Sequence, residues 1–253
     1  MTPTLRGRLK ASLLHFTFTL IVAASVAAAV FLLWYPWPYS EVSGGGALFL
    51  LIVGVDVVLG PLITLVVFDI AKPRSELWRD MAVVVVLQLA GLAYGAHTMF
   101  VARPVVLALE QDRFRAVIAA SVVESELSKA PEPLRALSIS GPLLVNTREA
   151  TGEERADAVL LAMSGADLGM RPSFWQEWDE RARAQVQKVG KPVSELLARH
   201  PAQAAELRAA VAKTSRPIEQ LIYIPMLARR TDWSVLLDKS TGDPVGFAPV
   251  DGF

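Results

Sequence analysis

A single carboxylate lies inside a long apolar stretch of this sequence. Asp56 is the one charged residue between Ala47 and Phe68. A charge at the centre of a bilayer is costly unless it is neutralised or paired, so such residues are functional candidates by default. At about 1.5 Å of rise per residue, Tyr94 and Ser25 come to the same depth as Asp56. Two interpretations remain open: a protonated Asp56 hydrogen bonds inside its own bundle, or it receives a polar group from a partner helix.

Small residues gather near the same level and favour close helix packing. Gly91 and Gly95 form a G-x-x-x-G step, and Gly60 follows Asp56 by about one helical turn. Such faces let helix backbones approach closely, mostly within one bundle. Pro61 removes a backbone donor and predicts a kink in its helix. The candidate intramembrane contacts, with another helix of the chain or with a partner, are Asp56, Gly60, Pro61, Gly91, Tyr94 and Gly95.

Other patterns that would indicate catalysis or metal binding are missing from the sequence. The chain has no Cys, and its three His residues, His15, His97 and His200, have no ligand spacing. Ser164-Gly165 lacks the flanking residues of a nucleophile elbow. We therefore expect no enzymatic activity, no cofactor and no metal site. Four carboxylates near the C-terminus are typical of turns and strand edges: Asp232, Asp238, Asp243 and Asp251.

Three apolar runs must position Asp56 and the glycines. Ser12–Trp34, Ala47–Phe68 and Met81–Ala102 are each close to the roughly 20 residues that cross about 30 Å of hydrocarbon as a helix. They raise the hydrophobic content to 53%, which excludes a disordered chain. The first run exceeds the apolar core of a signal peptide and ends in an aromatic belt, which predicts a retained anchor. We expect a three-helix transmembrane region over residues 1–103, with helices at about 12–34, 47–68 and 81–102.

Basic residues in the short connections predict the orientation of these helices. The loop between the first two runs carries no Lys or Arg. Since cytoplasmic loops are enriched in Lys and Arg, we expect a cytoplasmic N-terminus and, in a bacterial inner membrane, a periplasmic location from Arg103 onward. The basic residues that flank the runs are Arg6, Arg8 and Lys10 at the N-terminus and Lys72, Arg74 and Arg79 after the second run.

Residues 104–253 have the pattern of an α+β domain, with β-favouring runs at both ends and helical spacing between them. We expect one antiparallel sheet with helices packed on one face. The expected strands are Val105–Glu110, Phe114–Ala119, Pro142–Thr147, Tyr223–Leu227, Trp233–Asp238 and Val245–Val250. The expected helices are Glu153–Ala166, Ser173–Val189, Val193–Arg199 and Ala202–Lys213.

Several short motifs resemble one known family across essentially the whole chain. The resemblance is to the TfpX/TfpZ family of type IV pilin accessory proteins, and its membrane half is the more specific part. It extends to the C-terminus through Ile224-Pro225, Leu236-Leu237-Asp238 and Thr241-Gly242. The motifs in and near the membrane half are Trp34-Tyr35-Pro36, Gly54–Leu62, Leu87–Gly95, Arg103-Pro104 and Asp112-Arg113-Phe114.

The resemblance implies an inner-membrane protein that assists type IV pilus assembly together with a particular major pilin. It implies no enzymatic activity and no cofactor, and it does not say which residues touch pilin. A pilin awaiting assembly is held by one membrane helix and carries a periplasmic head, so the expected partners are that helix, the head and the bilayer. The 25 basic and 25 acidic residues balance, which excludes a global nucleic-acid-binding surface. The alternative function is a membrane-anchored enzyme that modifies pilin or another envelope substrate.

Overall fold

The chain forms two compact units in a computed structural model that describes residues 3–152, 154–163 and 165–253. The helical unit comprises Met1–Trp34 and Gly45–Val101. The C-terminal unit comprises Tyr35–Gly44 and Ala102–Phe253. The segment between the first two long helices therefore belongs to the C-terminal unit. The expected transmembrane region over residues 1–103 had included this segment.

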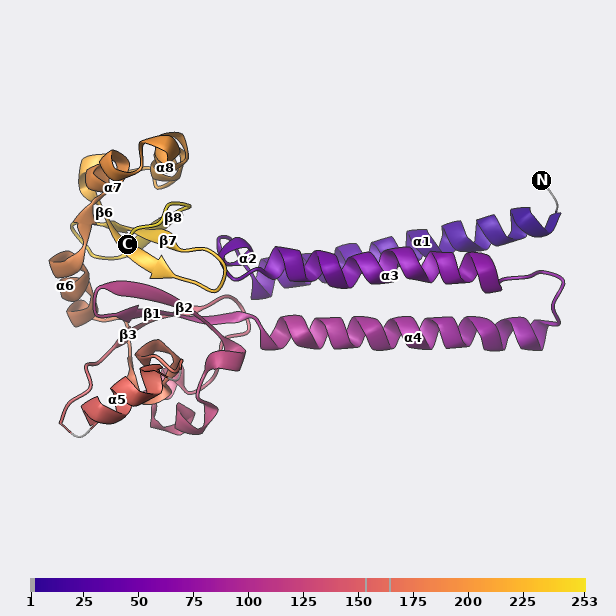
Figure 1. Cartoon of the computed structure of the whole chain (residues 1–253), viewed down its shortest axis with the longest axis horizontal. Helices are drawn as coiled ribbons and strands as arrows, with labels where there is room; N and C mark the ends of the chain where they lie inside the picture. Colours follow the sequence, from indigo (N-terminus) through magenta and orange to yellow (C-terminus); the bar gives the residue numbers. More distant parts are fainter. Residues whose placement is uncertain (1–2, 153, 164) are drawn as a thin grey trace. The chain divides into compact units, whose positions relative to one another are not determined.

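The helical unit contains three helices that are long and apolar enough to cross a membrane, within the described part of the chain. Helix α1 (Pro3–Ala29) continues as a five-residue π-helix, η1 (Val30–Trp34). Helices α3 (Gly45–Val67) and α4 (Arg74–Val101) follow, and α3 packs against both α1 and α4 (Figure 1). The prediction of three long apolar helices, each able to span a membrane, is confirmed.

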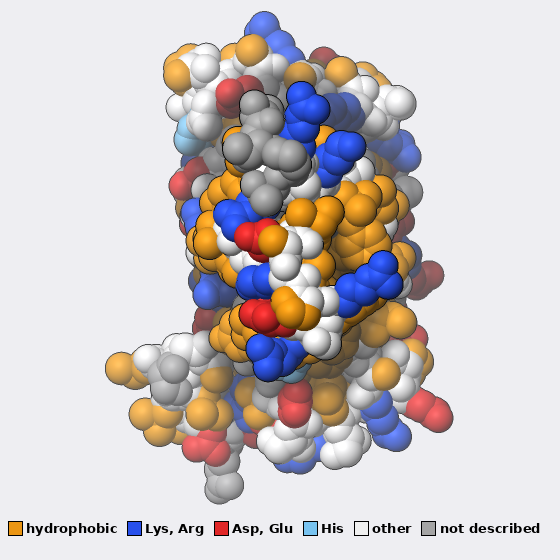
Figure 2. All heavy atoms as spheres, turned by 90° about the vertical axis from the view of Figure 1, so that its right-hand side faces the viewer, with side chains coloured by type: hydrophobic (Ala, Val, Ile, Leu, Met, Phe, Trp, Pro, Cys, Tyr) orange, Lys and Arg blue, Asp and Glu red, His pale blue; other side chains and the backbone are white. Residues whose placement is uncertain are grey.

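Charged side chains gather at the end of the helical unit that carries the start of α1 and the α3–α4 connection, while hydrophobic side chains cover the flanks (Figure 2). Two ion pairs lie at this end, Arg8–Asp69 at 2.8 Å and Lys72–Asp80 at 2.6 Å. Toward the other end, aromatic rings meet edge to face, with 5.2 Å between the ring centres of Trp34 and Phe100. This distribution is typical of a membrane-spanning bundle, because the apolar flanks match hydrocarbon and the charged end matches water.

The segment Tyr35–Gly44, which contains the short helix α2 (Tyr39–Val42), is part of the core of the C-terminal unit. Tyr39 and Val42 are buried in the same hydrophobic cluster as the central strands. The backbone N–H of Arg230 donates to the carbonyl of Val42 at 3.0 Å. The C-terminal unit is therefore built from two separate stretches of chain.

One mixed sheet of eight strands organises the C-terminal unit, in the order β4-β3-β1-β2-β6-β7-β8 with β5 also paired to β6 (Figure 1). The fold class, long apolar helices followed by an α+β unit, is confirmed. The strands are β1 (Pro104–Glu110), β2 (Arg113–Ile118), β3 (Leu143–Thr147), β4 (Trp175–Gln176), β5 (Lys191–Pro192), β6 (Leu221–Leu227), β7 (Trp233–Asp238) and β8 (Pro244–Ala248).

Two details of the expected sheet need correction. Most pairings are antiparallel as expected, but β1 with β3 and β2 with β6 are parallel. These strands are joined by long connections, which allow parallel pairing where a hairpin does not. Helices also cover both faces: Ile222 and Ile224 of β6 pack near α6, whereas Leu221 and Tyr223 pack near α7 and α8. The continuous apolar runs of β1 and β6 are typical of strands buried on both faces.

The helices of the C-terminal unit are α5 (Glu154–Met163), α6 (Glu180–Val189), α7 (Val193–Arg199) and α8 (Ala204–Lys213). Short 3-10 helices connect the elements, among them η5 (Leu168–Met170) and η6 (Pro172–Phe174). The expected helix Ser173–Val189 is wrong over its first seven residues. Trp175 instead pairs with Thr147 of β3, and the carboxylate of Asp179 caps α6 by accepting from the N–H groups of Arg181 and Ala182. Glu153, the expected first residue of the preceding helix, lies outside the described residues.

Candidate intramembrane site

An open groove of about 490 Å³ runs along the helical unit, bounded by α1, α3 and α4. It exists because α1 and α4 both pack on α3. Its walls are mainly apolar, with Asp56, His15, Thr64 and Gln88 among the residues that line it. Asp56, the carboxylate predicted from the sequence to be a candidate site, therefore lines a groove and is partly accessible.

The Asp56 carboxylate has no hydrogen-bond partner among the residues that the structure describes. Neither residue expected at its depth fills that role: Ser25 Oγ donates to the carbonyl of Ile21 in its own helix, and the Tyr94 side chain is 76% exposed. The nearest small residue is Gly91, where an added Cβ would lie 3.3 Å from Asp56 Oδ1. Gly91 thus leaves room for the carboxylate on the α4 side of the groove.

The other polar side chains of this level form a cluster across all three helices. His15 Nδ1 lies 2.6 Å from Thr64 Oγ1, and His15 Nε2 lies 2.5 Å from Gln88 Oε1. Because an amide oxygen only accepts, the N–H of His15 Nε2 donates to Gln88, and the Thr64 hydroxyl is hydrogen bonded to the other ring nitrogen, Nδ1. The amide nitrogen of Gln88 donates to the backbone carbonyl of Asp56 at 3.1 Å. Each of these side chains is paired, which distinguishes them from Asp56.

The small residues predicted from the sequence lie between α3 and α4. A Cβ at Gly60 would overlap the amide of Gln88, and a Cβ at Gly95 would overlap Ile52. Both glycines are buried. Pro61 is also buried, and its carbonyl accepts a hydrogen bond from Ser12 Oγ at 2.9 Å. Gly60, Pro61 and Gly95 therefore serve packing inside the unit, whereas Asp56, Gly91 and Tyr94 remain accessible from outside it.

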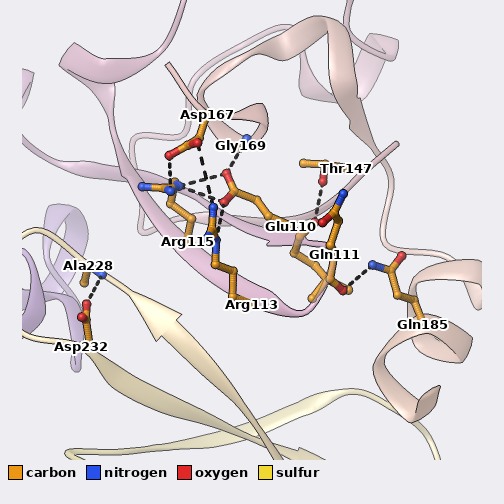
Figure 3. Close-up of polar contacts among 11 residues, drawn as sticks. Glu110, Gln111, Arg113, Arg115, Thr147, Asp167, Gly169, Gln185, Ala228 and Asp232 are labelled. Carbon is orange, nitrogen blue, oxygen red and sulfur yellow. Dashed lines mark hydrogen bonds and ion pairs between the residues drawn. The ribbon is translucent and has the colours of Figure 1, made fainter. Parts of the chain in front are cut away.

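A second polar cluster lies in the C-terminal unit, at the β1–β2 hairpin (Figure 3). Glu110 is 5% exposed and accepts from Arg115 at 3.0 Å and from the N–H of Gly169 at 2.7 Å. Arg115 also binds Asp167, and Arg113 binds Glu110. A buried charge is tolerated when it is paired and its remaining lone pairs are used, which holds here. Within the described residues, each charged side chain of this cluster has a partner, and the cluster fixes η5 to the hairpin.

Asp232 and Asp238 have the turn roles expected from the sequence, whereas Asp243 accepts hydrogen bonds from Trp178 and Arg183. Asp232 accepts from the N–H of Ala228, and Asp238 accepts from Ser240. Within the described residues, no group of three or more potential metal ligands occurs. Ser164 lies outside the described residues.

Sequence reasoning missed the cluster formed by His15, Thr64 and Gln88. The sequence did contain an indication of this cluster, because one of these three polar residues lies in each of the three apolar runs. Their pairing depends on how the three helices align, and His15 and Gln88 are 73 positions apart. Spacing along the chain does not reveal such a contact.

The relatives of this chain are named for fimbrial assembly. Residues 3–44 match the family model described as fimbrial assembly protein FimB. The fimbrial assembly proteins of serogroups I and E1 from Dichelobacter nodosus are 31% and 30% identical over 234 residues, which cover 91% of this chain and 91% of each relative. The chain belongs to the fimbrial assembly protein family. No solved structure matches it.

Membership of the fimbrial assembly protein family supports a role in pilus biogenesis and agrees with the expectation from the sequence. The family model covers α1 and Tyr35–Gly44, which are the first long helix and the segment that enters the core of the C-terminal unit. The relatives are named as assembly proteins, not as enzymes.

Proposed function

We propose that this chain is an inner-membrane accessory protein that assists type IV pilus assembly by binding its cognate major pilin. The chain is similar over nearly its full length to relatives that are named fimbrial assembly proteins. This is the observation that carries the proposal. The protein acts by contact with pilin and not by catalysis. The narrower identification with pilin accessory proteins of the TfpX/TfpZ type belongs to the same proposal.

In this proposal the N-terminus is cytoplasmic and the C-terminal unit is periplasmic. Support comes from the basic residues. Three precede the apolar run Ser12–Trp34, none lies between the first two runs, and three lie between residues 69 and 80. The charged end of the helical unit seen in Figure 2 then faces the cytoplasm. A pilin held by one membrane helix with a periplasmic head could contact both units, and two weak contacts together give useful avidity.

The proposed pilin contacts in the membrane are drawn from the accessible members of the predicted site. Asp56 and Gly91 line or border the groove, and Tyr94 projects from α4. Gly60, Pro61 and Gly95 contribute indirectly, because they hold α3 against its neighbours.

Two experiments test this function. A clean deletion, in a strain without a paralogue, should lower surface pili while pilin synthesis stays intact; normal piliation would refute the proposal. A periplasm-dependent reporter fused after Phe253 should be active and one fused between Lys72 and Arg79 inactive. The reverse pattern would refute the orientation.

A further inference from the structure

From the groove geometry we infer that the space between α1 and α4 is the docking site for one apolar transmembrane helix that brings a single hydrogen-bonding side chain to Asp56. The inference rests on the proposed function, because the occupant that it names is the membrane helix of the client pilin. It adds the site, the anchoring residue and the chemistry that the client must carry.

The first step is the shape and lining of the groove. Its wall on α1 includes Ala23 and its wall on α4 includes Leu89 and Leu92, so most of the lining is hydrocarbon. Ala23 is small, and so is Gly91 beside Asp56. Small residues allow the close backbone approach on which helix association in membranes depends. The groove therefore suits an apolar helix better than a polar ligand.

The second step concerns the hydrogen-bond partners of the polar side chains that line the groove. Thr19 Oγ1 donates to the carbonyl of His15 at 3.0 Å. Both ring nitrogens of His15 have partners, and both ends of the Gln88 amide are used. Among the described residues that line this groove, Asp56 is thus the polar residue whose side chain has no hydrogen-bond partner. A polar group that has no partner in hydrocarbon is costly, so the occupant must supply one.

The third step concerns specificity. One unpaired carboxylate in an apolar groove favours a helix whose single polar side chain lies at the depth of Asp56. It disfavours a helix that has only apolar side chains at that depth. An occupant with a misplaced polar group leaves two groups unpaired instead of none. A site that must form a hydrogen bond discriminates between ligands more strongly than a site that makes only apolar contacts, because the wrong ligand leaves a polar group unpaired. Asp56 thus sets the register of the client helix as well as its affinity.

The test is site-specific photo-cross-linking in cells that carry the full chain and the pilin. A photoreactive phenylalanine analogue replaces Leu92 in the groove, or Leu87, which is 63% exposed on α4 and does not line the groove. We expect a cross-link to pilin, detected with a pilin antibody, from position 92 and not from position 87. A cross-link from position 87 alone, or to a second copy of this chain, would overturn the inference.

Two Asp56 variants test the chemistry in the same assay. Asp56→Asn should retain most of the cross-link, because an amide still donates and accepts. Asp56→Leu should lower it about threefold or more at normal protein abundance, the loss expected for one membrane hydrogen bond. Equal cross-linking by both variants, loss in both, or loss of the Leu variant from the membrane would each overturn the role of Asp56.

The outcomes also separate this inference from the proposed function. Pilin that co-purifies with the wild-type chain but does not cross-link to position 92 would reject the groove and leave pilin binding intact. Pilin that neither cross-links at any position nor co-purifies with the wild-type chain would reject both.

Discussion

His15 of α1 donates a hydrogen bond to Gln88 of α4, with 2.5 Å between Nε2 and Oε1, although both helices pack on α3. The contact joins the two walls of the groove through side chains. Thr64 of α3 holds the other ring nitrogen, so one imidazole connects three helices. The groove therefore has a fixed width at this level, set by polar bonds in an apolar surrounding.

The first prediction is that His15 and Gln88 are energetically coupled. His15→Ala and Gln88→Ala, measured alone and together by thermal unfolding in detergent, should give a coupling energy of about 0.6 kcal/mol, with about 1.7 kcal/mol as the upper end for membrane hydrogen bonds. His15→Ala combined with Thr98→Ala is the control, because Thr98 bonds within its own helix to the carbonyl of Tyr94. Additive effects for His15 and Gln88 would show that the bridge is not formed.

The second prediction concerns the contact between α3 and α4. Gly95→Ala should lower thermal stability in detergent by about 1–3 kcal/mol, because the new methyl group overlaps the β-branched side chain of Ile52. Gly54→Ala is the matched control. It makes the same change in a membrane helix, but an added Cβ at Gly54 meets nothing within 4 Å. Equal stability of the two variants would contradict the observed packing.

The membrane half of the fold follows from local signals in the sequence. Three apolar runs of helical length predict three spans, and one acidic residue in such a run predicts Asp56 as a candidate site. The mixed sheet does not follow, because the parallel pairs β1–β3 and β2–β6 join strands far apart in the chain. The segment Tyr35–Gly44 has no periodicity that indicates burial. Its place in the C-terminal core arises from tertiary packing alone.

The third prediction tests that packing. Tyr39 is 6% exposed, and its ring centre lies 5.8 Å from that of Phe247. Tyr39→Ala should destabilise the C-terminal unit by about 3–5 kcal/mol, as expected for removal of a buried aromatic ring. Limited proteolysis of the full-length protein in detergent should then cleave within residues 104–253 at lower protease concentration. Glu41→Ala, at an exposed position of the same short helix, should leave the protease resistance unchanged.

The fourth prediction is that the C-terminal unit loses stability in acid. Burial alone raises the pKa of Glu126, but hydrogen bonds from Arg171 and Ser173 outweigh it and lower the pKa overall. Hydrogen bonds from Ser240, together with the charge of Arg216, hold the pKa of Asp238 below its usual range despite burial. A carboxylate whose pKa is lower in the folded state than in the unfolded state stabilises the fold. This stabilisation is fully present above the unfolded-state pKa of about 4 and is lost as the pH falls through the folded-state pKa.

Unfolding of the full-length protein, followed by limited proteolysis between pH 7 and pH 3, should therefore show stability that falls below about pH 4. Glu126→Gln should be less stable than wild type at pH 7, because the ion pair with Arg171 at 2.8 Å is lost. The same variant should lose less stability on acidification, since one titrating group is gone. If the variant and the wild type lose equal stability between pH 5 and pH 3, the Glu126 carboxylate does not stabilise the fold through its charge.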